Sequence, residues 1–379
     1  MSPVPRHTVV CTIGTRPEAI KMAPVIRAFR ECPWVRCRIL FTAQHRELVD
    51  QMLRFFDLEP DIDLDIMRPD QTLVDLTSRL LGRVAEALAR EAPALVLAQG
   101  DTTTVLAAAL ASYYRKIPFG HVEAGLRTGN LFAPFPEEAN RVLAGRLSAL
   151  HFAPTVAARD NLLAEGIDPE TVHVTGNTVI DALLLAARRD VPIGVELDPR
   201  ARLVLVTAHR RDSFGEPIRD ICRAVAQLVE DFPDVQVLWP VHPNPAIRPV
   251  VEGLLGETPR VHLCDPLSYG PFVAAMKRAT LILTDSGGVQ EEAPALGKPV
   301  LVLRRESERP EAVAAGVARL VGHDAQRIVA EASRLLRDPV AYRAMSVGAS
   351  PYGDGHASGR IVAAVGRYLG VAGPLRATG

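Results

Sequence analysis

The sequence predicts a doubly wound α/β protein built from two similar halves. Short runs of apolar and β-branched residues alternate with segments of helical periodicity, and the connections between them are short. The run 94–98 is almost wholly apolar, which is typical of a strand in the middle of a parallel sheet. After a stretch at 190–202 that is rich in proline, glycine and charge, the same alternation begins again.

The first half begins with a strand, a loop and a helix. Pro17 falls at the start of that helix, where proline is favoured because the first N–H groups of a helix have no partner to lose. The segment 73–92 repeats apolar residues every three or four positions, which predicts a long amphipathic helix. Strands are expected at 8–13, 35–42, 94–98, 117–122, 150–153 and 172–175, and helices at 19–32, 47–56, 73–92, 103–114, 137–145, 156–165 and 177–189.

The second half repeats this order after the linker candidate 190–202. Strands are expected at 203–207, 235–241, 260–263, 280–283 and 299–303, and helices at 216–231, 269–278, 289–296, 325–337 and 358–369. Each half is Rossmann-like, and sheets of this kind bind ligands at the carboxyl ends of their strands. The repetition therefore predicts a cleft between the two halves.

The composition limits the class of protein. A chain of 379 residues suggests two domains, and its 48% of apolar residues must form aliphatic cores because aromatic residues make up only 5%. A net charge of −1 argues against a general binder of nucleic acid or membrane surfaces. Five scattered cysteines and a start without an apolar leader predict reduced thiols in the cytoplasm. The spacing of the cysteines does not suggest a zinc site, and no apolar run approaches the length of a membrane span.

Polar residues collect where the expected strands end. In the first half these clusters are 14–16, 99–104, 121–127 and 134–141, and in the second half they are 209–211, 240–245, 285–292 and 304–310. Chance placement would scatter such residues along both edges of a sheet, whereas these clusters all fall at the carboxyl edge. The joint pattern predicts a binding site, although each cluster alone has a structural explanation.

An anion site is predicted at Ser286, Gly287 and Gly288. Two glycines between a strand and a helix let the backbone approach a ligand, and the N–H groups of the helix start then face it. A tight turn that merely needs glycine is the structural alternative. Arg16 offers a planar fork for phosphate oxygens, and Lys21, one to two turns further along its helix, would support that site.

Four carboxylates near these loops need a different role, because they would repel a diphosphate. They are Asp101, Glu123, Glu137 and Glu292. Carboxylates accept hydrogen bonds from sugar hydroxyls or move protons, and a nucleotide sugar carries both phosphates and hydroxyls. The sequence has neither a Gly-x-Gly-x-x-Gly fingerprint near its start nor a Walker-type loop, which disfavours a dinucleotide dehydrogenase.

Taken singly, these residues leave structural alternatives open. Asp101 could cap the following helix, and Glu137 could be an ordinary charge in a first helical turn. His209 could be a buried, hydrogen-bonded imidazole, and Arg16 could be one surface arginine among many. Only the combination favours a functional site.

The motifs together resemble the bacterial non-hydrolysing UDP-N-acetylglucosamine 2-epimerases, over nearly the whole chain. In the first half the matching segments are GTRPEAIKMAP (14–24), TAQHR (42–46), QGDTT (99–103), HVEAGLR (121–127), PEEANR (136–141) and TGNT (175–178). In the second half they are HRR (209–211), DSGGVQEE (285–292), ERP (308–310) and PYGDG (351–355).

This resemblance implies a glycosyltransferase-B-like fold, with two Rossmann-like domains that face a cleft, in a cytoplasmic homodimer. The domains would be 1–176 and 177–357, with the segment 358–379 packing back on the first. The implied reaction interconverts UDP-N-acetylglucosamine and UDP-N-acetylmannosamine by elimination of UDP to 2-acetamidoglucal and re-addition, which supplies N-acetylmannosamine for cell-surface polysaccharide. No metal or other cofactor is expected, and neither nucleic acid nor a membrane is an expected partner.

The resemblance also implies roles for individual residues. Asp101, Glu123 and Glu137 match the catalytic carboxylates, and His209 matches the essential histidine. The implied substrate contacts are Arg16, Lys21, Ser286, Gly287 and Gly288 around the diphosphate, Glu292 at the ribose, Phe272 beside the uracil, and Arg309 elsewhere on the substrate. A second site at which the substrate activates some family members would use Gln44, His45, Gln71 and His242.

The chain departs from the family pattern at three positions without losing a reacting group. Asp70, Ala208 and Leu267 stand where arginine, glycine and glutamine are more usual, and Asp70 belongs to the region of the second site. Three rival functions remain: an epimerase of a modified UDP-sugar such as a 2,3-diacetamido uronic acid, a glycosyltransferase, and a nucleotide-sugar sensor. The number of carboxylates argues against the transferase, which needs one base.

Overall fold

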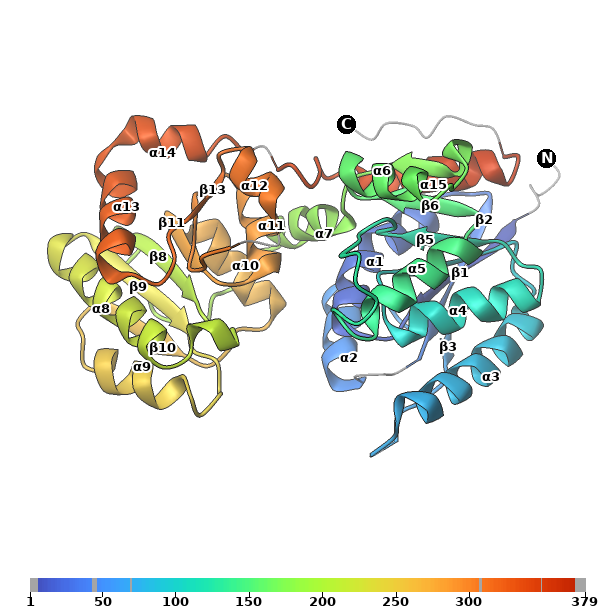
Figure 1. Cartoon of the computed structure of the whole chain (residues 1–379), viewed down its shortest axis with the longest axis horizontal. Helices are drawn as coiled ribbons and strands as arrows, with labels where there is room; N and C mark the ends of the chain where they lie inside the picture. The colour runs from blue at the N-terminus through green and yellow to red at the C-terminus, as the bar shows by residue number, and fades with distance from the viewer. Residues whose placement is uncertain (1–5, 43–45, 69, 307–308, 349, 372–379) are drawn as a thin grey trace. The chain divides into compact units, whose positions relative to one another are not determined.

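The computed structural model describes residues 6–42, 46–68, 70–306, 309–348 and 350–371. It contains two parallel sheets flanked by helices (Figure 1), so the expected doubly wound α/β class is confirmed. Contacts between Cα atoms divide the chain into two compact units. Unit 1 comprises 1–182 and 353–379, and unit 2 comprises 183–352.

Unit 1 is built on a parallel sheet with the strand order β3-β2-β1-β4-β5-β6-β7. Its strands are β1 (His7–Ile13), β2 (Val35–Phe41), β3 (Ile62–Asp63), β4 (Leu95–Gln99), β5 (Phe119–Val122), β6 (Leu150–Ala153) and β7 (Val172–Val174). Its helices are α1 (Arg16–Arg30), α2 (Arg46–Phe55), α3 (Leu73–Glu91), α4 (Thr103–Tyr114), α5 (Glu137–Leu147), α6 (Val156–Ala164), η1 (Pro169–Thr171) and α15 (Ala357–Tyr368), and α7 (Thr178–Ala187) leads into unit 2. The order reverses between β1 and β4, so the loops after these strands flank a topological switch point.

The core of unit 1 is aliphatic, as the composition requires. Val10, Leu40 and Val96 come from three adjacent strands and are fully buried in a cluster that includes the apolar faces of α3 and α4. Burial of one such side chain contributes about 1.5–3 kcal/mol. This packing gives the sheet a rigid base, so the loops at its carboxyl edge can hold side chains in fixed positions.

Unit 2 repeats the design with the strand order β10-β9-β8-β11-β12-β13. Its strands are β8 (Arg202–Thr207), β9 (Val235–Pro240), β10 (Val261–Cys264), β11 (Leu281–Thr284), β12 (Val300–Val302) and β13 (Ala318–Leu320). Its helices are η2 (Arg211–Ser213), α8 (Glu216–Asp231), α9 (Arg248–Leu255), α10 (Tyr269–Arg278), α11 (Gly287–Ala295), α12 (Pro310–Ala314), α13 (Ala325–Arg337) and α14 (Pro339–Met345). Here the switch point lies between β8 and β11.

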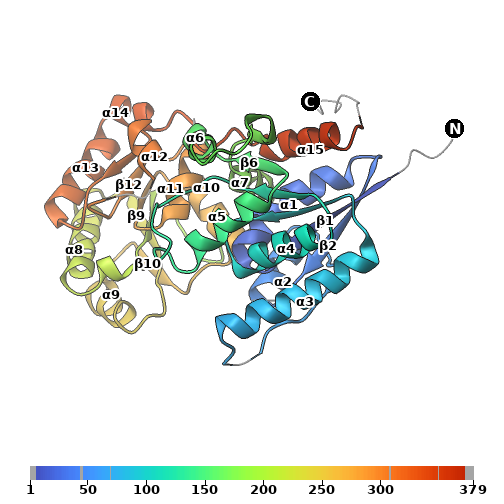
Figure 2. The same ribbon diagram turned by 45° about the vertical axis from the view of Figure 1, so that its right-hand side comes forward.

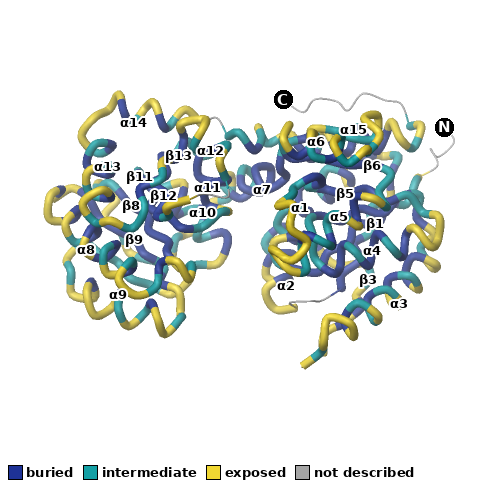
Figure 3. Tube along the Cα trace, in the orientation of Figure 1, coloured by how far each residue is buried: buried dark blue, intermediate teal, exposed yellow. Residues whose placement is uncertain are grey.

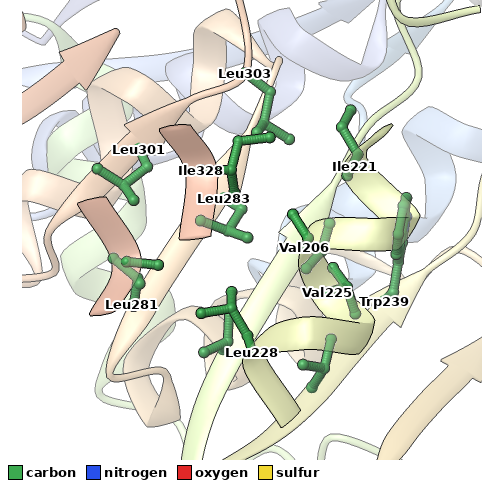
Figure 4. Packing of buried hydrophobic residues seen from close by; sticks show 14 of the residues in the cluster. Val206, Ile221, Val225, Leu228, Trp239, Leu281, Leu283, Leu301, Leu303 and Ile328 are labelled. Carbon is green, nitrogen blue, oxygen red and sulfur yellow. The ribbon is translucent and has the colours of Figure 1, made fainter. Parts of the chain in front are cut away.

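The core of unit 2 lies between its sheet and the helices α8 and α13. Figure 4 shows Val206, Leu283 and Leu301 from three strands pointing toward Leu228 of α8 and Ile328 of α13. Trp239 of β9 is also fully buried in this cluster, although its indole N–H has no hydrogen-bond partner among the described residues. In both units inner strands such as β4 and β11 are buried along their whole length, whereas the edge strands β7 and β10 are not (Figure 3). Full burial of inner strands is expected for parallel sheets covered on both faces.

The last helix returns to unit 1. The Asp181 carboxylate accepts hydrogen bonds from the backbone N–H groups of Ala357 at 3.2 Å and Ser358 at 2.8 Å, where a negative charge suits the start of α15. The helix then packs on α1, as both ribbon views show (Figure 1, Figure 2). Contacts therefore divide the chain at 182/183 and 352/353, whereas the domain boundaries expected at 176/177 and 357/358 stay a prediction.

The expected helices and strands lie within three residues of their observed bounds, but seven short elements of the described chain were missed. These are β3, β13, α9, α12, α14 and the 3-10 helices η1 and η2. The two residues of β3 and the five of α12 are too few to display a period of 2.0 or 3.6. Such elements form because a preformed sheet edge or helix layer supplies their partners, which local sequence does not encode.

Candidate active site

One buried carboxylate ties together the two loops at the switch point of unit 1. Glu18 of α1 is 2% exposed. Its Oε2 accepts hydrogen bonds from the backbone N–H groups of Gly14 at 2.5 Å and Thr15 at 3.1 Å, and its Oε1 accepts one from Thr102 Oγ1 at 2.5 Å. Burial raises the pKa of Glu18 to about 7, although the three donors oppose the shift. Sequence analysis missed this role; the available signal was an acidic residue three positions after Thr15 at a helix start.

Asp101, directly after β4, pairs with a cation and does not cap a helix. The N-cap of α4 is Thr102, whose hydroxyl accepts from the N–H of Val105 at 3.4 Å, so the capping alternative for Asp101 is wrong. Asp101 Oδ2 accepts from Arg141 Nη2 at 2.6 Å. Burial raises the pKa of Asp101, the Arg141 charge opposes that shift, and the carboxylate of Glu123 adds to it.

Glu123, directly after β5, has a strained backbone and a fully engaged carboxylate. Its φ of 65° lies in the left-handed region, which costs a non-glycine residue roughly 1–2 kcal/mol. Its oxygens accept from Lys21 Nζ at 2.6 and 2.8 Å, from Asn177 Nδ2 at 2.9 Å, and from Gln99 Nε2. The side chain is 8% exposed. Strain that the surroundings maintain in this way is concentrated at functional positions.

The start of α5 brings two more carboxylates to this edge. Glu137 is half-buried, and its charge is among those that raise the pKa of Asp101. Glu138 is 1% exposed and accepts from the backbone N–H groups of Thr128 at 2.9 Å and Gly129 at 3.1 Å. Glu138 thus anchors the preceding loop. Glu137 lies in the first turn of α5, as the structural alternative for this residue predicted, and its charge also acts on Asp101.

Arg16 and Lys21, both on α1, have different surroundings. Arg16 is half-buried at the helix start, and no hydrogen bond or ion pair engages its side chain within the described residues. Its guanidinium is therefore available to an anion. Lys21 contacts the carboxylate of Glu123, and its expected place near the same phosphates stays a prediction.

The switch point of unit 2 is organised around Asp285, which follows β11. Its Oδ2 accepts from the backbone N–H groups of His209 and Arg210 and from Ser213 Oγ, each at 2.8 Å. The residue is 0% exposed. The side chain of His209 is 42% exposed, so the alternative of a buried imidazole is wrong. The His209 ring stacks on that of His242, with centroids 5.9 Å apart and planes at 20°.

The helix start after Asp285 offers unpaired backbone donors. Ser286 is the N-cap of α11, its side chain makes no capping hydrogen bond, and no acceptor within the described residues faces the N–H groups of Gly287 and Gly288. A Cβ on Gly287 would meet no atom closer than Arg210 Nη2 at 3.7 Å, so the fold itself does not require glycine here. A tight turn therefore does not explain this glycine, whereas close approach of a ligand does.

Three further expected contacts lie on the helices beside this loop. Glu292 of α11 is 8% exposed and accepts from Tyr269 Oη at 3.5 Å, and Phe272 is half-buried on α10. Arg309, just before α12, donates from Nε to Glu291 Oε1. Sequence analysis gave no role to Glu291, which here orients a cationic side chain.

The residues expected at a second site are only partly described. Gln44 and His45 lie outside the described residues. Gln71 accepts from Arg79 Nη1 at 2.8 Å through its side-chain oxygen, and the neighbouring Asp70 has a φ of 54°. His242 contacts His209, which was expected at the first site and not at the second.

The described ranges hold no group of three or more His, Cys, Asp or Glu side chains placed to bind a metal ion. None of their helices is both long and apolar enough to cross a bilayer.

Comparison with known proteins identifies the family. The family model described as UDP-N-acetylglucosamine 2-epimerase matches residues 27–366. A probable UDP-N-acetylglucosamine 2-epimerase of Ralstonia nicotianae is 53% identical, over 95% of this chain and 99% of its own. The crystal structure of a putative UDP-N-acetylglucosamine 2-epimerase from Listeria monocytogenes is 45% identical, with a TM-score of 0.91 over 97% of this chain and 98% of that one.

A second solved structure carries a ligand. It is UDP-GlcNAc 2-epimerase from Neisseria meningitidis bound to UDP-GlcNAc, which is 45% identical, with a TM-score of 0.82 over 95% of this chain and all of that one. The match to the family model spans most of the chain, and both the relative and the structures cover nearly its full length. The chain therefore belongs to the UDP-N-acetylglucosamine 2-epimerase family.

Proposed function

We propose that the protein interconverts UDP-N-acetylglucosamine and UDP-N-acetylmannosamine by eliminating UDP to 2-acetamidoglucal and adding it back. The observation that carries this proposal is the contrast between the switch points. One gathers Asp101, Glu123 and Glu137, and the other presents the open helix start at Gly287 and Gly288. An enzyme that acts on a nucleotide sugar in this way needs one region for proton transfer and another for phosphate binding.

The chemistry follows from the weak acidity of the sugar. The proton on C2 is not acidic enough for simple removal near neutral pH, so its loss is coupled to departure of the diphosphate. A carboxylate takes the C2 proton, the C2–H electron pair forms the C1=C2 bond, and the C1–O pair leaves with UDP. On return UDP adds to C1, and a proton reaches C2 from the opposite face, which inverts that centre.

The carboxylates of unit 1 supply the proton transfers. Glu123 is held by a cation and two amides, whereas Asp101 has a raised pKa and a single arginine partner. The two carboxylates repel each other when both are charged, so the protonation of one depends on that of the other. Either acid can therefore serve as proton donor after the other has accepted a proton. Glu137 extends this set.

Unit 2 supplies the groups that bind UDP and stabilise its departure. The N–H groups of Gly287 and Gly288, together with Ser286, would bind the diphosphate, and a preorganised donor of this kind lowers the barrier because it needs no reorientation. His209 would act beside the departing phosphate. Glu292 would accept from the ribose hydroxyls, and Phe272 would lie beside the uracil. From unit 1, Arg16 would add its guanidinium to the diphosphate, while Lys21 would act on the substrate through Glu123.

Arg309 would reach the substrate while Glu291 orients its guanidinium. The candidate second site at Gln71 and His242, with Gln44 and His45, stays a prediction.

We further propose that the protein works in the cytoplasm as a homodimer and supplies N-acetylmannosamine units for cell-surface polysaccharide, as the family resemblance implies. Light scattering behind a sizing column would test the assembly, and a mass of one chain would contradict it.

Exchange at C2 tests the reaction directly. UDP-N-acetylglucosamine incubated with the enzyme in deuterium oxide should gain deuterium at C2 and form UDP-N-acetylmannosamine, both followed by NMR. UDP binding without exchange would contradict the proposal and indicate a sensor. Turnover of only a 2,3-diacetamido uronic acid derivative, or loss of donor only with an acceptor present, would replace the proposed reaction with one of its rivals.

A further inference from the structure

Asp285 holds the loop that carries His209 through one of its two carboxylate oxygens. Oδ2 receives hydrogen bonds from the N–H groups of His209 and Arg210 and from Ser213 Oγ, all at 2.8 Å. The three donors are neutral and all come from the connection between β8 and α8. Asp285 therefore joins the ends of β8 and β11, the two strands at the switch point of unit 2.

The other oxygen of Asp285 is directed toward the imidazole. Oδ1 lies 3.3 Å from His209 Nδ1, and it is a buried atom without a hydrogen-bond partner among the described residues. A buried carboxylate oxygen left without a donor is destabilising, because it has lost its hydrogen bonds to water. A proton on Nδ1 of His209 would supply this oxygen with a donor, whereas a bare Nδ1 would place two acceptors against each other.

The second ring beside His209 restrains its plane. His242 stacks on it, and Nδ1 of His242 accepts from the N–H of Asn244 at 3.2 Å, which fixes the orientation of that neighbour. With Nδ1 committed to Asp285 and one face covered by His242, Nε2 is the nitrogen of His209 left for a ligand. The 42% exposure of the side chain is consistent with such access.

We infer that Asp285 is a positioning residue that fixes His209 as its Nδ1–H tautomer and directs Nε2 to the reacting UDP-sugar. This inference rests on the proposed function, in which His209 acts beside the departing diphosphate. When His209 carries a second proton, its Nε2–H would donate to a phosphate oxygen as negative charge develops there. The aspartate of serine proteases orients the catalytic histidine in the same way, although here no nucleophilic serine is involved.

A competing partner for Oδ1 is His323, which follows β13. The charge of Asp285 acts on its imidazole, and its Nε2 is also a buried atom without a partner among the described residues. If Oδ1 belonged to His323, substitution of Asp285 would change the tautomer of His323 and leave that of His209 unchanged.

The tautomer is measurable without any assay of activity. In protein with ¹⁵N-labelled histidine at a pH where His209 is neutral, long-range NMR correlations should show Nδ1 protonated and Nε2 bare. The signals are assigned from the spectrum of His209→Gln. A wild-type His209 that carries its proton on Nε2 overturns the inference, whether or not any variant of Asp285 folds.

Asp285→Asn provides the decisive variant. The three donors on the Oδ2 side require the amide oxygen to stay there, so the amide NH₂ must face Nδ1 and should reverse the tautomer of His209. We expect kcat to fall roughly 10²–10⁴-fold with KM changed less than about threefold, because substrate contacts remain while the tautomer is wrong. An unchanged tautomer, or a loss carried by KM alone, contradicts the inference.

Two control variants separate this effect from general disturbance. Asp234→Asn makes the same change at the opposite edge of the same sheet, where Asp234 pairs with Arg202 on the surface, and should alter neither tautomer nor kcat. His323→Gln should leave the tautomer of His209 unchanged. A wild-type enzyme with the expected tautomer but no exchange at C2 would contradict the proposed function and leave the Asp285–His209 pair standing.

Discussion

The two switch points share one topology and carry opposite electrostatics. In unit 1 the strand ends hold acidic side chains, and cations neutralise them: Lys21 lies on Glu123 and Arg141 on Asp101. In unit 2 the buried Asp285 is held by neutral donors, and the helix start beside it leaves its N–H groups open. The fold fixes where ligands bind, while the residues after each strand decide which part of a ligand is bound.

The difference has a physical origin in the cost of burying charge. A buried carboxylate is stable only with donors or cations around it, and the choice between them sets its chemistry. Cationic partners favour the ionised form of a buried carboxylate, which is the form that can accept a proton. Neutral donors hold Asp285 as a fixed part of the loop. Substitutions in unit 1 should therefore affect proton transfer, whereas substitutions in unit 2 should affect the binding of UDP or its departure.

The largest effect is expected from the acids of unit 1. Asp101→Asn and Glu123→Gln should each lower the rate of C2 exchange about 10²–10⁴-fold, because a proton donor or acceptor is lost, while UDP affinity stays within a few-fold. Exchange by NMR and UDP titration by calorimetry measure the two quantities. Asp160→Asn, a surface substitution, serves as the matched control. Loss of UDP binding with normal exchange would reverse the roles assigned to the two units.

Removal of the cation beside Glu123 tests why that carboxylate tolerates burial. Lys21→Met should lower the free energy of unfolding by roughly 3–5 kcal/mol, because it leaves a largely buried charge without its cation. The double variant Lys21→Met with Glu123→Gln should regain much of that stability but no activity. Arg90→Met, which disturbs only the exposed pair with Glu86, should cost less than about 1 kcal/mol. Equal losses in both single variants would mean that the Lys21–Glu123 pair is not special.

Glu18 predicts a dependence of stability on pH. Burial raises its pKa from 4.5 to about 7, so between these values the folded protein holds a proton that the unfolded chain has released. Its contribution to stability is therefore complete below pH 4.5 and is lost as the pH rises through 7. Glu18→Gln can keep all three hydrogen bonds while removing the charge. Thermal unfolding should show that the free energy of unfolding falls between pH 5 and pH 8. The fall should be smaller in Glu18→Gln than in the wild type, by on the order of 2–3 kcal/mol. An equal fall in the free energy of unfolding in the wild type and in Glu18→Gln would contradict the raised pKa of Glu18.

The smallest effect is expected at the helix start of unit 2. Gly287→Ala adds a methyl group that the protein accommodates but that lies where a phosphate oxygen would approach. We expect KM to rise about tenfold, which corresponds to roughly 1.4 kcal/mol, with little change in kcat or melting temperature. In Gly253→Ala the new methyl group meets no atom within 4 Å, so KM should not change. An unchanged KM in Gly287→Ala would contradict the proposal that the diphosphate binds at this loop.

Most of the fold could be predicted because its signals are local. A parallel strand is an apolar run and an amphipathic helix repeats every 3.6 residues, so both can be recognised without knowledge of their partners. The missed elements were those stabilised from outside, such as the two residues of β3, which pair with Leu40 and Phe41 of β2. The sequence therefore predicted where each main strand ends, and so which edge of the sheet carries the polar clusters.

The candidate site was predicted less completely, because pairs of side chains are not local. The sequence marked Asp101 and Glu123, but it did not show that Arg141 and Lys21 would neutralise them. Lys21 was expected near phosphate and contacts a carboxylate 102 residues away. Asp285 stood in the glycine-rich motif without a role, because its partners lie 72 to 76 residues earlier in the chain.

The sequence by itself determined the two parallel α/β units, the edge of each sheet at which the polar clusters lie, and the family. These follow from periodicity and from motifs of contiguous residues. Only the tertiary structure decided which charges meet, that Glu18 joins two loops, and that Asp285 faces the imidazole of His209. The reason is that burial and pairing free energies depend on distances between residues far apart in the chain, and these distances exist only after the strands have aligned.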